Sequence, residues 1–526
     1  MSPTRATRSR GPPRCSRWSR SLAMIDSQAM LDKVWFILPE IWLFLGAVVV
    51  SMMGLSRAKL LRDAVPFVVC FFLAAAMAAI PWVYADKSRL AEANLLMPTL
   101  GPYVKMIVCG IGIVLSMLSV GLIDRGIEDA IKSGRARFDP IRLCRGEYFA
   151  FFLLSLIGAM LVCNANDLIW LFLALELTSL PTYVMVAISR PSPKAQEAAV
   201  KYFFLGALAA ALFLYGFALL YGSTGSMELT VMRAEFAKQV AAGGLDRLAI
   251  VGMILALLGV SFKIVAVPMH FYAADVYEGA ASPVSAFLAF VPKTAGMVAM
   301  ILLLGTIGWS GHAGPGSVGL PQPILVTLWM IAVLTMTLGN VGALLQRSTK
   351  RLLAYSSIAH SGYLLIGVIA GPGLGIDAVL FYLLAYGVMN IVPFAVLAGL
   401  QRRGEEIESL DDLAGLRFRY PVMAVVMAVA AMSLIGFPPL LGFVGKFSLL
   451  VAGVQAKHVP LVVIALINSA ISAWYYLRLV GLPILASPTA ASDTVKHSAS
   501  PWPRVAAVLA AVAIVVLPFF VNQLLP

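Results

Sequence analysis

Charged residues are scarce in this sequence. Asp, Glu, Lys and Arg make up 12% of its 526 residues and hydrophobic residues make up 60%, whereas soluble domains are about 25% charged and about 45–50% apolar. The five cysteines form no Cys-x-x-Cys pair, which argues against an iron–sulfur cluster, a zinc site or a disulfide framework. A Walker A loop and a strand-to-helix GxGxxG motif are also absent. The composition therefore predicts a polytopic membrane protein without cofactor chemistry of its own.

The hydrophobic residues gather into fourteen spans. These spans are approximately 34–53, 65–85, 102–123, 147–164, 168–189, 197–221, 247–273, 283–308, 323–345, 351–370, 374–400, 420–453, 459–482 and 503–522. Most of them are close to the ~20 residues that a helix needs to cross a bilayer. We therefore expect an all-α integral membrane protein with about 14 transmembrane helices.

The seventh and twelfth spans are too long for a single crossing. The seventh is interrupted at Pro268, and the middle of the twelfth reads GFPPLLG (436–442). Proline removes a backbone hydrogen bond and breaks helices. Broken helices in membranes are tolerated only where they face protein or a wet cavity. We expect helices 7 and 12 to be discontinuous and to mark functional positions.

The two broken spans lie five spans apart, which suggests a repeat. Because a unit of five crossings is odd, a second copy would enter the membrane from the opposite side. Helices 4–8 (147–308) and helices 9–13 (323–482) are therefore predicted to form two inverted five-helix repeats, an architecture found in many ion transporters. Helices 1–3 (34–123) precede the repeats and helix 14 (503–522) follows them.

Lysine and arginine cluster in alternate connections between the spans. The first, third, fifth, ninth and eleventh connections are basic, whereas the second, fourth, eighth and tenth carry little or balanced charge. By the positive-inside rule the odd connections are cytoplasmic, so both termini lie outside. Residues 1–33 form a basic leader with six arginines and no acid within 1–23, which contradicts that orientation. An organelle transit peptide and an over-extended start, with Met24 or Met30 as the first residue, remain open. We expect the leader not to belong to the working protein.

Two opposite charges stand alone inside apolar spans. Lys263 is the only charged residue within 248–274, and Glu176 is the only one within 168–188. A lysine in the bilayer centre costs roughly 2.5–3.5 kcal/mol on insertion scales, and a buried carboxylate is expected either to pair with a cation or to be protonated. We predict that the two side chains pair. Two alternatives are a Lys263 side chain that extends to the lipid headgroups and a structural ion pair that only holds two helices together.

Four further ionisable residues lie within the spans. They are Lys201, Lys293, His360 and Lys446. Lys201 follows Glu197 at i,i+4, so simple helix support is an alternative to a role in proton transfer. His360 shares a helix face with Ser356 and Ser357 and either relays protons near neutral pH or packs as a satisfied core residue. Together with the pair above, these groups predict a proton path at mid-membrane depth, although a cation antiporter would use the same elements.

Several motifs are similar to those of a known family. The stretch VPMHFYAADVYEGAASPVSAFLAFVPKTAGM (267–297) combines a proline-broken seventh helix, a DVYEGA loop and a lysine in a PK-A-G context. From about residue 34 onward the chain resembles the N subunits of bacterial respiratory complex I, the proton-pumping NADH–quinone oxidoreductase, which are homologues of mitochondrial subunit 2. The related M and L subunits and the multisubunit sodium/proton antiporters more often carry a WLPDA-type loop there. The M subunits usually have a glutamate where this chain has Lys446, and the L subunits have a long C-terminal lateral helix.

Other stretches discriminate less or depart from the family pattern. KRLLAYSSIAHSGYLLIGV (350–368) is typical of the whole superfamily. YEGAASPV (277–284) stands where relatives often show YEGAPTPV, and FYA (271–273) replaces the more usual HLW or HMW. These departures affect the loop and its packing but not the ionisable residues.

The resemblance implies proton-translocation roles for six residues. They are Glu176, Lys201, Lys263, Lys293, His360 and Lys446. Glu176 and Lys263 resemble a fifth-helix glutamate and seventh-helix lysine pair whose opening changes the proton affinity of the lysine. Lys293 is similar to a central relay with His360 beside it, and Lys446 to a terminal group that exchanges protons with the periplasm. Lys201 matches a sixth-helix lysine near the pair.

The resemblance also implies a setting for the chain. It would be a non-redox subunit of a hetero-oligomeric enzyme in the bacterial inner membrane, with M-, K-, J- and L-type membrane subunits as partners and both termini periplasmic. NADH, FMN, iron–sulfur clusters and quinone would belong to partner subunits, and this chain would bind no cofactor, metal or nucleic acid. Two alternatives stay open: a subunit of a multisubunit Na+/H+ antiporter, and a membrane anchor whose buried charges only lock helices together.

Overall fold

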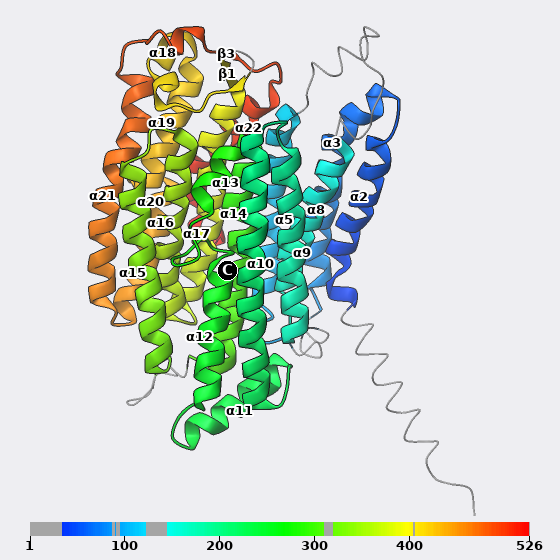
Figure 1. Ribbon diagram of the computed structural model, residues 1–526, viewed down its shortest axis with the longest axis vertical. Helices are drawn as coiled ribbons and strands as arrows, with labels where there is room; N and C mark the ends of the chain where they lie inside the picture. Colours follow the sequence, from blue (N-terminus) through cyan, green and yellow to red (C-terminus); the bar gives the residue numbers. More distant parts are fainter. Residues whose placement is uncertain are drawn as a thin grey trace, which may run out of the picture.

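The computed structural model describes residues 34–86, 90, 95–122, 145–309, 319–402 and 405–524. Most of the described chain is helical, and the helices run side by side along the long axis of one bundle (Figure 1). The all-α prediction is confirmed. The predicted leader 1–33 and most of the basic third connection lie outside the described residues.

The helices follow the predicted spans closely. The first ten are α2 (Leu38–Gly54), α3 (Lys59–Val83), α5 (Leu100–Ser119), α8 (Arg145–Val162), α9 (Leu168–Ile188), α10 (Pro193–Thr224), α11 (Leu229–Ala241), α12 (Arg247–Ser261), α13 (Ala273–Gly279) and α14 (Ser282–Ile307). The others are α15 (Gln322–Leu344), α16 (Thr349–Ala370), α17 (Leu374–Gly399), α18 (Leu416–Arg419), α19 (Pro421–Ile435), α20 (Leu441–Gln455), α21 (Val459–Ile484), α22 (Trp502–Val516) and α23 (Val521–Leu524). Short 3-10 turns are η1 (Val120–Leu122), η2 (Leu410–Leu413), η3 (Ser492–Thr494) and η4 (Leu517–Phe520). Three short strands, β1 (Leu400–Arg402), β2 (Glu405–Glu406) and β3 (Lys496–His497), form an antiparallel sheet in the order β2-β1-β3.

Among the described residues, ten helices are long and apolar enough to cross a membrane. They are α3, α5, α9, α10, α14, α15, α16, α17, α21 and the helical segment 502–520. Five shorter apolar helices, α2, α8, α12, α19 and α20, complete the set. Each predicted span contains at least one of these helices, and the chain is a multi-pass membrane protein. The count of fourteen crossings stays a prediction.

The two predicted helix breaks are present. α12 ends at Ser261 and α13 begins only at Ala273, with Pro268 between them. α19 ends at Ile435 and α20 begins at Leu441 after the Pro438–Pro439 pair. Since proline cannot donate the backbone hydrogen bond that continues a helix, each break leaves a half-helix end inside the bundle.

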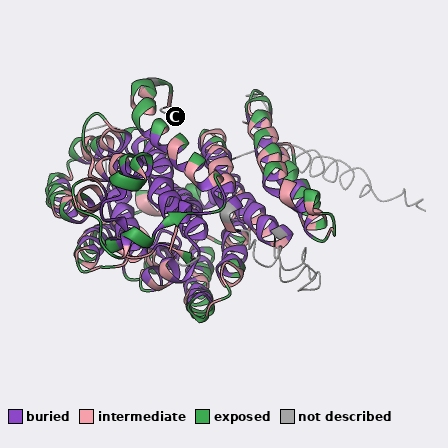
Figure 2. Cartoon of the chain, turned by 90° about the horizontal axis from the view of Figure 1, so that it is seen from above, coloured by how far each residue is buried: buried purple, intermediate pink, exposed green. Residues whose placement is uncertain are grey.

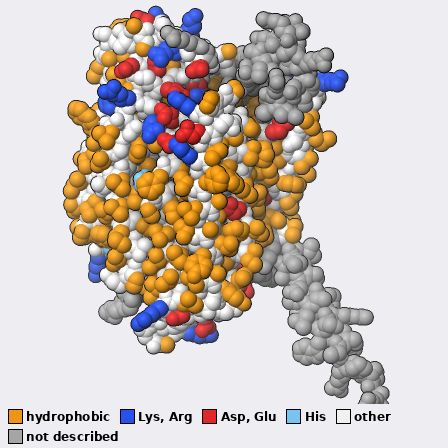
Figure 3. Space-filling model, viewed as in Figure 1, with side chains coloured by type: hydrophobic (Ala, Val, Ile, Leu, Met, Phe, Trp, Pro, Cys, Tyr) orange, Lys and Arg blue, Asp and Glu red, His pale blue; other side chains and the backbone are white. Residues whose placement is uncertain are grey.

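Two helices that carry predicted site residues, α14 and α16, lie at the centre of the bundle. Every residue of α14 is buried, and so are nearly all residues of α16 and α17. Seen from above, buried residues line the inside of the bundle and exposed ones its outside (Figure 2). One face shows hydrophobic side chains over its middle, with charged side chains gathered toward its two ends (Figure 3). A helix placed inside this belt can keep a charge away from lipid.

The two ends of the bundle carry a matching pair of backbone contacts. We call the end with α18 and the β-sheet the sheet end, and the opposite end the α11 end (Figure 1). Asp167, before α9, forms an isolated bridge with Glu228 before α11, and Ser348, before α16, forms one with Ser409 before η2. Backbone hydrogen bonds flank both bridges in the same pattern. Ser348 and Ser409 each lie 181 positions after their counterparts, and an inverted repeat predicts this arrangement.

Glu406 of β2 ties the two predicted repeats together at the sheet end. Its carboxylate accepts hydrogen bonds from the Arg190 guanidinium, from Ser282 Oγ at 2.7 Å and from Lys350 Nζ at 3.1 Å. Burial acts to raise the pKa of Glu406, but Lys350 and Arg190 outweigh it and hold the pKa at about 2. The charged carboxylate thus provides a counter-ion for Lys350, whose side chain is fully buried.

Glu406→Gln should lower the melting temperature at neutral pH. A carboxyl whose pKa falls from 4.5 to about 2 on folding contributes stability above pH 4.5 and loses it as pH falls toward 2. The difference between wild type and variant should therefore shrink from about 3 kcal/mol at pH 7 to about 1 kcal/mol at pH 3. Thermal unfolding in detergent at both pH values measures it, and an equal difference at both would contradict the ionic role.

A second buried ion pair joins the first helices, and the sequence reasoning missed it. Lys105 Nζ of α5 lies 2.7 Å from Glu40 Oε1 of α2, with both side chains almost completely buried. Lys105 also donates to the Phe36 carbonyl at 2.7 Å, and Asn164 donates to the same oxygen at 3.1 Å. The sequence contains a signal for this pair, because Glu40 and Lys105 are each the only charged residue in their predicted spans. The pair connects helices 1 and 3 with the connection that leads into α9.

Single replacements of this pair should destabilise the protein, whereas the double replacement should not. Lys105→Met or Glu40→Leu alone leaves one buried charge without its partner, which typically costs about 3–5 kcal/mol. The double variant removes both charges, and apolar replacement of a whole buried pair is often neutral or stabilising. Melting temperatures of the three variants in detergent test this expectation. A double variant as unstable as the two singles combined would show that the pair is not an isolated ionic contact.

Candidate functional site

Lys263 and Glu176 meet as the sequence predicts. Lys263 Nζ donates to Glu176 Oε1 at 3.0 Å and to Ser179 Oγ at 2.6 Å. The lysine side chain is 1% exposed and the glutamate 17% exposed. Lys263 lies two residues beyond the end of α12, in the break, and the other two residues lie three positions apart on one face of α9. The break therefore lets the ammonium turn toward α9.

Lys201 lies apart from this pair. Its ammonium is 2.7 Å from Glu197 Oε1 and 2.7 Å from Asp275 Oδ2, and its side chain is 42% exposed. These carboxylates and Lys201 line a polar pocket of about 160 Å³, together with Lys194, Ala198, Glu278 and Gly279. Asp275 also accepts from Arg351 at 2.8 Å, so it bridges α10 and α16. The predicted i,i+4 contact with Glu197 is confirmed, and Lys201 lies at an open rim rather than in the buried row.

Lys293 occupies the centre of the bundle. Its side chain is fully buried in α14 and donates to the Ser357 carbonyl at 2.5 Å and to Ser357 Oγ at 2.9 Å. The Tyr386 ring centroid lies 4.5 Å from Nζ. No carboxylate pairs with this lysine in the part of the chain that the structure describes. A backbone carbonyl, a hydroxyl and an aromatic face take the place of a counter-ion.

A glycine brings the two lysines close together. A Cβ at Gly296 would lie 2.9 Å from Lys263 Cβ and 2.6 Å from Ile264 Cγ2, which real side chains do not allow. Gly296 is three residues after Lys293 on α14, so the broken segment and α14 touch at this point. The Ile264 carbonyl also accepts a hydrogen bond from Ser361 of α16.

His360 is held between two tyrosines. Its Nδ1 shares a hydrogen bond with the Tyr382 hydroxyl at 2.5 Å, and its Nε2 shares one with the Tyr476 hydroxyl at 2.9 Å. Tyr476 is in turn hydrogen-bonded to Ser356. A neutral imidazole donates through one nitrogen and accepts through the other, so this ring can pass a proton from one hydroxyl to the other.

Lys446 contacts the end of a half-helix. Its Nζ donates to the carbonyl of Ile435, the last residue of α19, at 3.0 Å, and lies 3.4 Å from Ser469 Oγ. The Tyr363 ring centroid lies 5.0 Å away. The last carbonyls of a helix lack intrahelical donors and carry partial negative charge. The broken twelfth helix thus supplies a cation site without a carboxylate.

One helix contacts all of these groups. Ser357 contacts Lys293, His360 follows one turn later, Ser361 contacts the backbone beside Lys263, and Tyr363 contacts Lys446. All four lie on α16, within seven residues of each other. The arrangement offers a series of hydroxyl, imidazole and amine groups at the centre of the bundle, which is the chemistry that proton transfer needs. Within the described ranges, no group of three or more His, Cys, Asp and Glu could hold a metal ion.

Sequence reasoning missed the tyrosines. Tyr363, Tyr382, Tyr386 and Tyr476 lie around His360, and two of them also contact Lys293 and Lys446. A tyrosine inside an apolar span looks like an ordinary core aromatic, so hydropathy gives no warning of it. The hydroxyl contacts of Tyr382 and Tyr476 with His360 become visible only when α16, α17 and α21 are brought together.

Comparisons with known proteins agree with this geometry. Residues 165–472 match the family described as "NADH:quinone oxidoreductase/Mrp antiporter, TM". The chain is 35% identical to the NADH-quinone oxidoreductase subunit N of Paramagnetospirillum magneticum, over 87% of this chain and 89% of the relative. It is 43% identical to the subunit N of Trichlorobacter lovleyi, over 64% of this chain and 66% of the relative.

Solved structures share the fold of this chain. A chain of respiratory complex I from Thermus thermophilus matches with a TM-score of 0.70 and 30% identity, covering 92% of this chain and 98% of that one. A chain of the Mrp complex from Dietzia sp. matches with a TM-score of 0.73 at 21% identity, covering 94% and 95%, which shows the shared fold alone. From the family match and the extent of the similarity to its relatives, the chain belongs to the N-subunit family of the NADH-quinone oxidoreductases.

Proposed function

We propose that this chain translocates protons in the membrane arm of an NADH-quinone oxidoreductase. The observation that carries the proposal is the buried row of Lys263, Lys293, His360 and Lys446, which residues of α16 contact directly or through the neighbouring backbone. Ionisable groups inside membrane spans are rare because each one is costly to keep there, and they commonly mark ion and proton pathways.

In this mechanism the Lys263–Glu176 pair acts as the switch. Two unit charges 4 Å apart interact by about 4 kcal/mol at an effective dielectric constant of 20. Opening the pair therefore changes the free energy of the ammonium at bilayer depth by a large amount. Ser179 keeps a hydrogen bond to Lys263 available when Glu176 moves. A proton released from Lys263 is passed to a neighbouring group of the row.

Lys293 and His360 act as the relay, and Lys446 as the terminal group. Ser357 contacts Lys293 directly and lies three residues before His360 on the same helix face. Tyr382 and Tyr476 extend the hydrogen-bonded chain from the imidazole. Lys446 is five residues into α20, which runs toward the α11 end, so it exchanges protons on that side. Lys201, at the polar rim, exchanges protons with water on the sheet side.

The remaining features of the proposal concern the setting. The chain is a non-redox subunit, with M-, K-, J- and L-type subunits as partners in the bacterial inner membrane. NADH, FMN, iron–sulfur clusters and quinone reside in those and other partner subunits. The sheet end is cytoplasmic and both termini are periplasmic, in agreement with the basic connections 190–194 and 347–351 at the sheet end. Residues 147–308 and 323–482 form the inverted repeats, which the two backbone bridges 181 positions apart support.

The first test is a mild-detergent pull-down of the C-terminally tagged chain. Flavin- and cluster-containing partners with NADH-dependent quinone reduction in the eluate would support the proposal. Small membrane partners without NADH activity, combined with sodium/proton exchange in vesicles, would favour the antiporter instead.

Lys263→Ala should leave assembly intact and abolish most proton movement. The variant removes the ammonium that Glu176 and Ser179 hold, so the switch cannot respond to its neighbour. NADH oxidation and proton uptake in membrane vesicles, normalised to assembled complex, measure the effect, and loss of one positioned proton-transfer group typically costs about 10²–10⁴-fold. Lys238→Ala is the matched control, because Lys238 lies on the exposed side of α11. Reduced assembly with normal turnover per complex would instead indicate a membrane anchor.

A further inference from the structure

Asn390 is a buried amide without hydrogen-bond partners. It lies in α17 with 1% of its surface exposed, and neither its Oδ1 nor its Nδ2 makes a hydrogen bond to any described residue. The hydroxyl of Tyr386, four residues earlier and therefore on the same helix face, lies near Ser357 but makes no hydrogen bond of good geometry. Two neighbouring polar groups thus share a buried face of the same helix.

The missing partners distinguish Asn390 from another buried amide. Asn340, an equally buried amide, is hydrogen-bonded to Tyr363, Asn468 and Tyr475. Leaving a buried amide unpaired is unfavourable. A hydrophobic side chain of similar size at this position of α17 would make the folded protein more stable if the position had only a packing role. Unpaired buried polar groups in native proteins usually contact ordered water or have a functional reason to be there.

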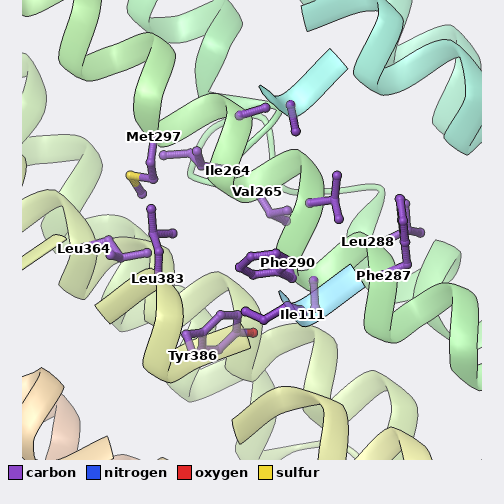
Figure 4. Packing of buried hydrophobic residues seen from close by; sticks show 14 of the residues in the cluster. Ile111, Ile264, Val265, Phe287, Leu288, Phe290, Met297, Leu364, Leu383 and Tyr386 are labelled. Carbon is purple, nitrogen blue, oxygen red and sulfur yellow. The ribbon is translucent and has the colours of Figure 1, made fainter. Parts of the chain in front are cut away.

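The position of the two groups indicates what they serve. The Tyr386 ring lies 4.5 Å from Lys293 Nζ, and in close view this tyrosine lies beside Ile111 and Phe290 (Figure 4). α17 runs from Leu374 toward the sheet end, so Asn390 lies one turn nearer to that end than Tyr386. Asn390 is nine residues before the end of α17 at Gly399, or about 14 Å at 1.5 Å per residue.

Further polar groups continue toward the sheet end. The Tyr277 hydroxyl of α13 shares a hydrogen bond with Ser357 Oγ at 3.3 Å, and Ser357 is the residue that holds Lys293. The Tyr277 ring packs against Phe394, one turn beyond Asn390 on α17, with 6.1 Å between ring centroids. Asn390 therefore lies on the segment between Lys293 and the charged cluster around Glu406.

We propose that Asn390 and Tyr386 hold water on the sheet-end side of Lys293 and that this water supplies Lys293 with protons. Buried water is stable where two to four polar partners surround it, and the amide oxygen, the amide nitrogen, the phenol and the lysine provide them. This inference rests on the proposed function, in which Lys293 is the central relay.

The step conserves atoms and charge. A water O–H bond breaks as an N–H bond forms on the neutral Lys293 amine, and the resulting hydroxide takes a proton from the next water toward the sheet end. One proton moves inward and no electrons are exchanged. Asn390 is a positioning residue here, because it orients the water rather than exchanging a proton itself.

The test compares Asn390→Leu with Asn390→Ser in the whole assembled complex. Asn390→Leu fills the space with an apolar group, so we expect an unchanged or higher melting temperature together with a roughly tenfold or greater loss of NADH-driven proton uptake. Asn390→Ser keeps a hydroxyl and leaves room for water, so it should restore most of the uptake. Asn340→Leu is the contrasting variant and should lower the melting temperature, because it leaves Tyr475 and Asn468 without their amide partner.

Tyr386→Phe provides an independent second variant. It removes only the hydroxyl and keeps the ring next to Lys293, so proton uptake should fall without loss of assembly. Tyr148→Phe is its control, since the Tyr148 hydroxyl bonds to Ser119 far along the chain from the row. If Asn390→Leu fails to assemble, the comparison of Tyr386→Phe with Tyr148→Phe still tests the water site.

The outcomes separate the two proposals. If wild-type and Lys263→Ala vesicles oxidise NADH and take up protons equally well, the proposed function is overturned. If Lys263→Ala lowers proton uptake while Asn390→Leu and Tyr386→Phe take up protons like the wild type, only the water site is overturned. A melting temperature lowered equally by Asn390→Leu and Asn390→Ser would also overturn it, because that result would mean that the amide is already paired.

Discussion

An ammonium group in the middle of a bilayer has to be stabilised by the protein, because hydrocarbon offers neither dipoles nor counter-ions. The three central lysines meet this requirement in three ways. Lys263 has a carboxylate and a hydroxyl, Lys293 has a carbonyl, a hydroxyl and a ring, and Lys446 has the carbonyl end of a half-helix. The backbone groups of a straight helix are hydrogen-bonded within that helix. Lys263 and Lys446 lie at the two helix breaks, where this pattern is interrupted.

The helix α16 makes these separate sites into one system. It lies between the broken segment, α14, α17 and α21, and almost every one of its residues is buried. Ser357, His360 and Ser361 share one face of α16 at helical spacing, and Tyr363 projects from another side of the helix toward Lys446. α16 thus contacts Lys293 and Lys446 and carries His360 between them.

Much of the fold was predictable because the bilayer restricts what a chain can do. Apolar spans of about 20 residues and proline-containing long spans gave the helices and both breaks. The pairing of Lys263 with Glu176 was predictable for the same reason, since each was the only charge in a long apolar stretch. Hydropathy reflects the free energy of transferring a side chain into lipid, so it identifies the residues for which this free energy is high.

The rest depended on neighbours that are distant in sequence. Lys201 proved to lie at an exposed rim, because a helix of 32 residues extends beyond the buried row and the sequence does not say which part is covered. Lys350 belonged to a basic connection, yet Glu406 follows it by 56 positions and allows it to be buried. The tyrosines around His360 and the unpaired amide of Asn390 have no distinguishing pattern, because their role depends on which helix faces them.

The spacing of 181 positions between the two backbone bridges also relates the residues of the proposed repeats. Applied to the first half, the same spacing aligns Glu176 with Ser357 and Ser179 with His360. In the proposed inverted repeat, the carboxylate next to Lys263 therefore corresponds to a serine in the second half, and the serine next to Lys263 corresponds to the histidine. The two halves would thus place different chemistry at equivalent positions of one helix.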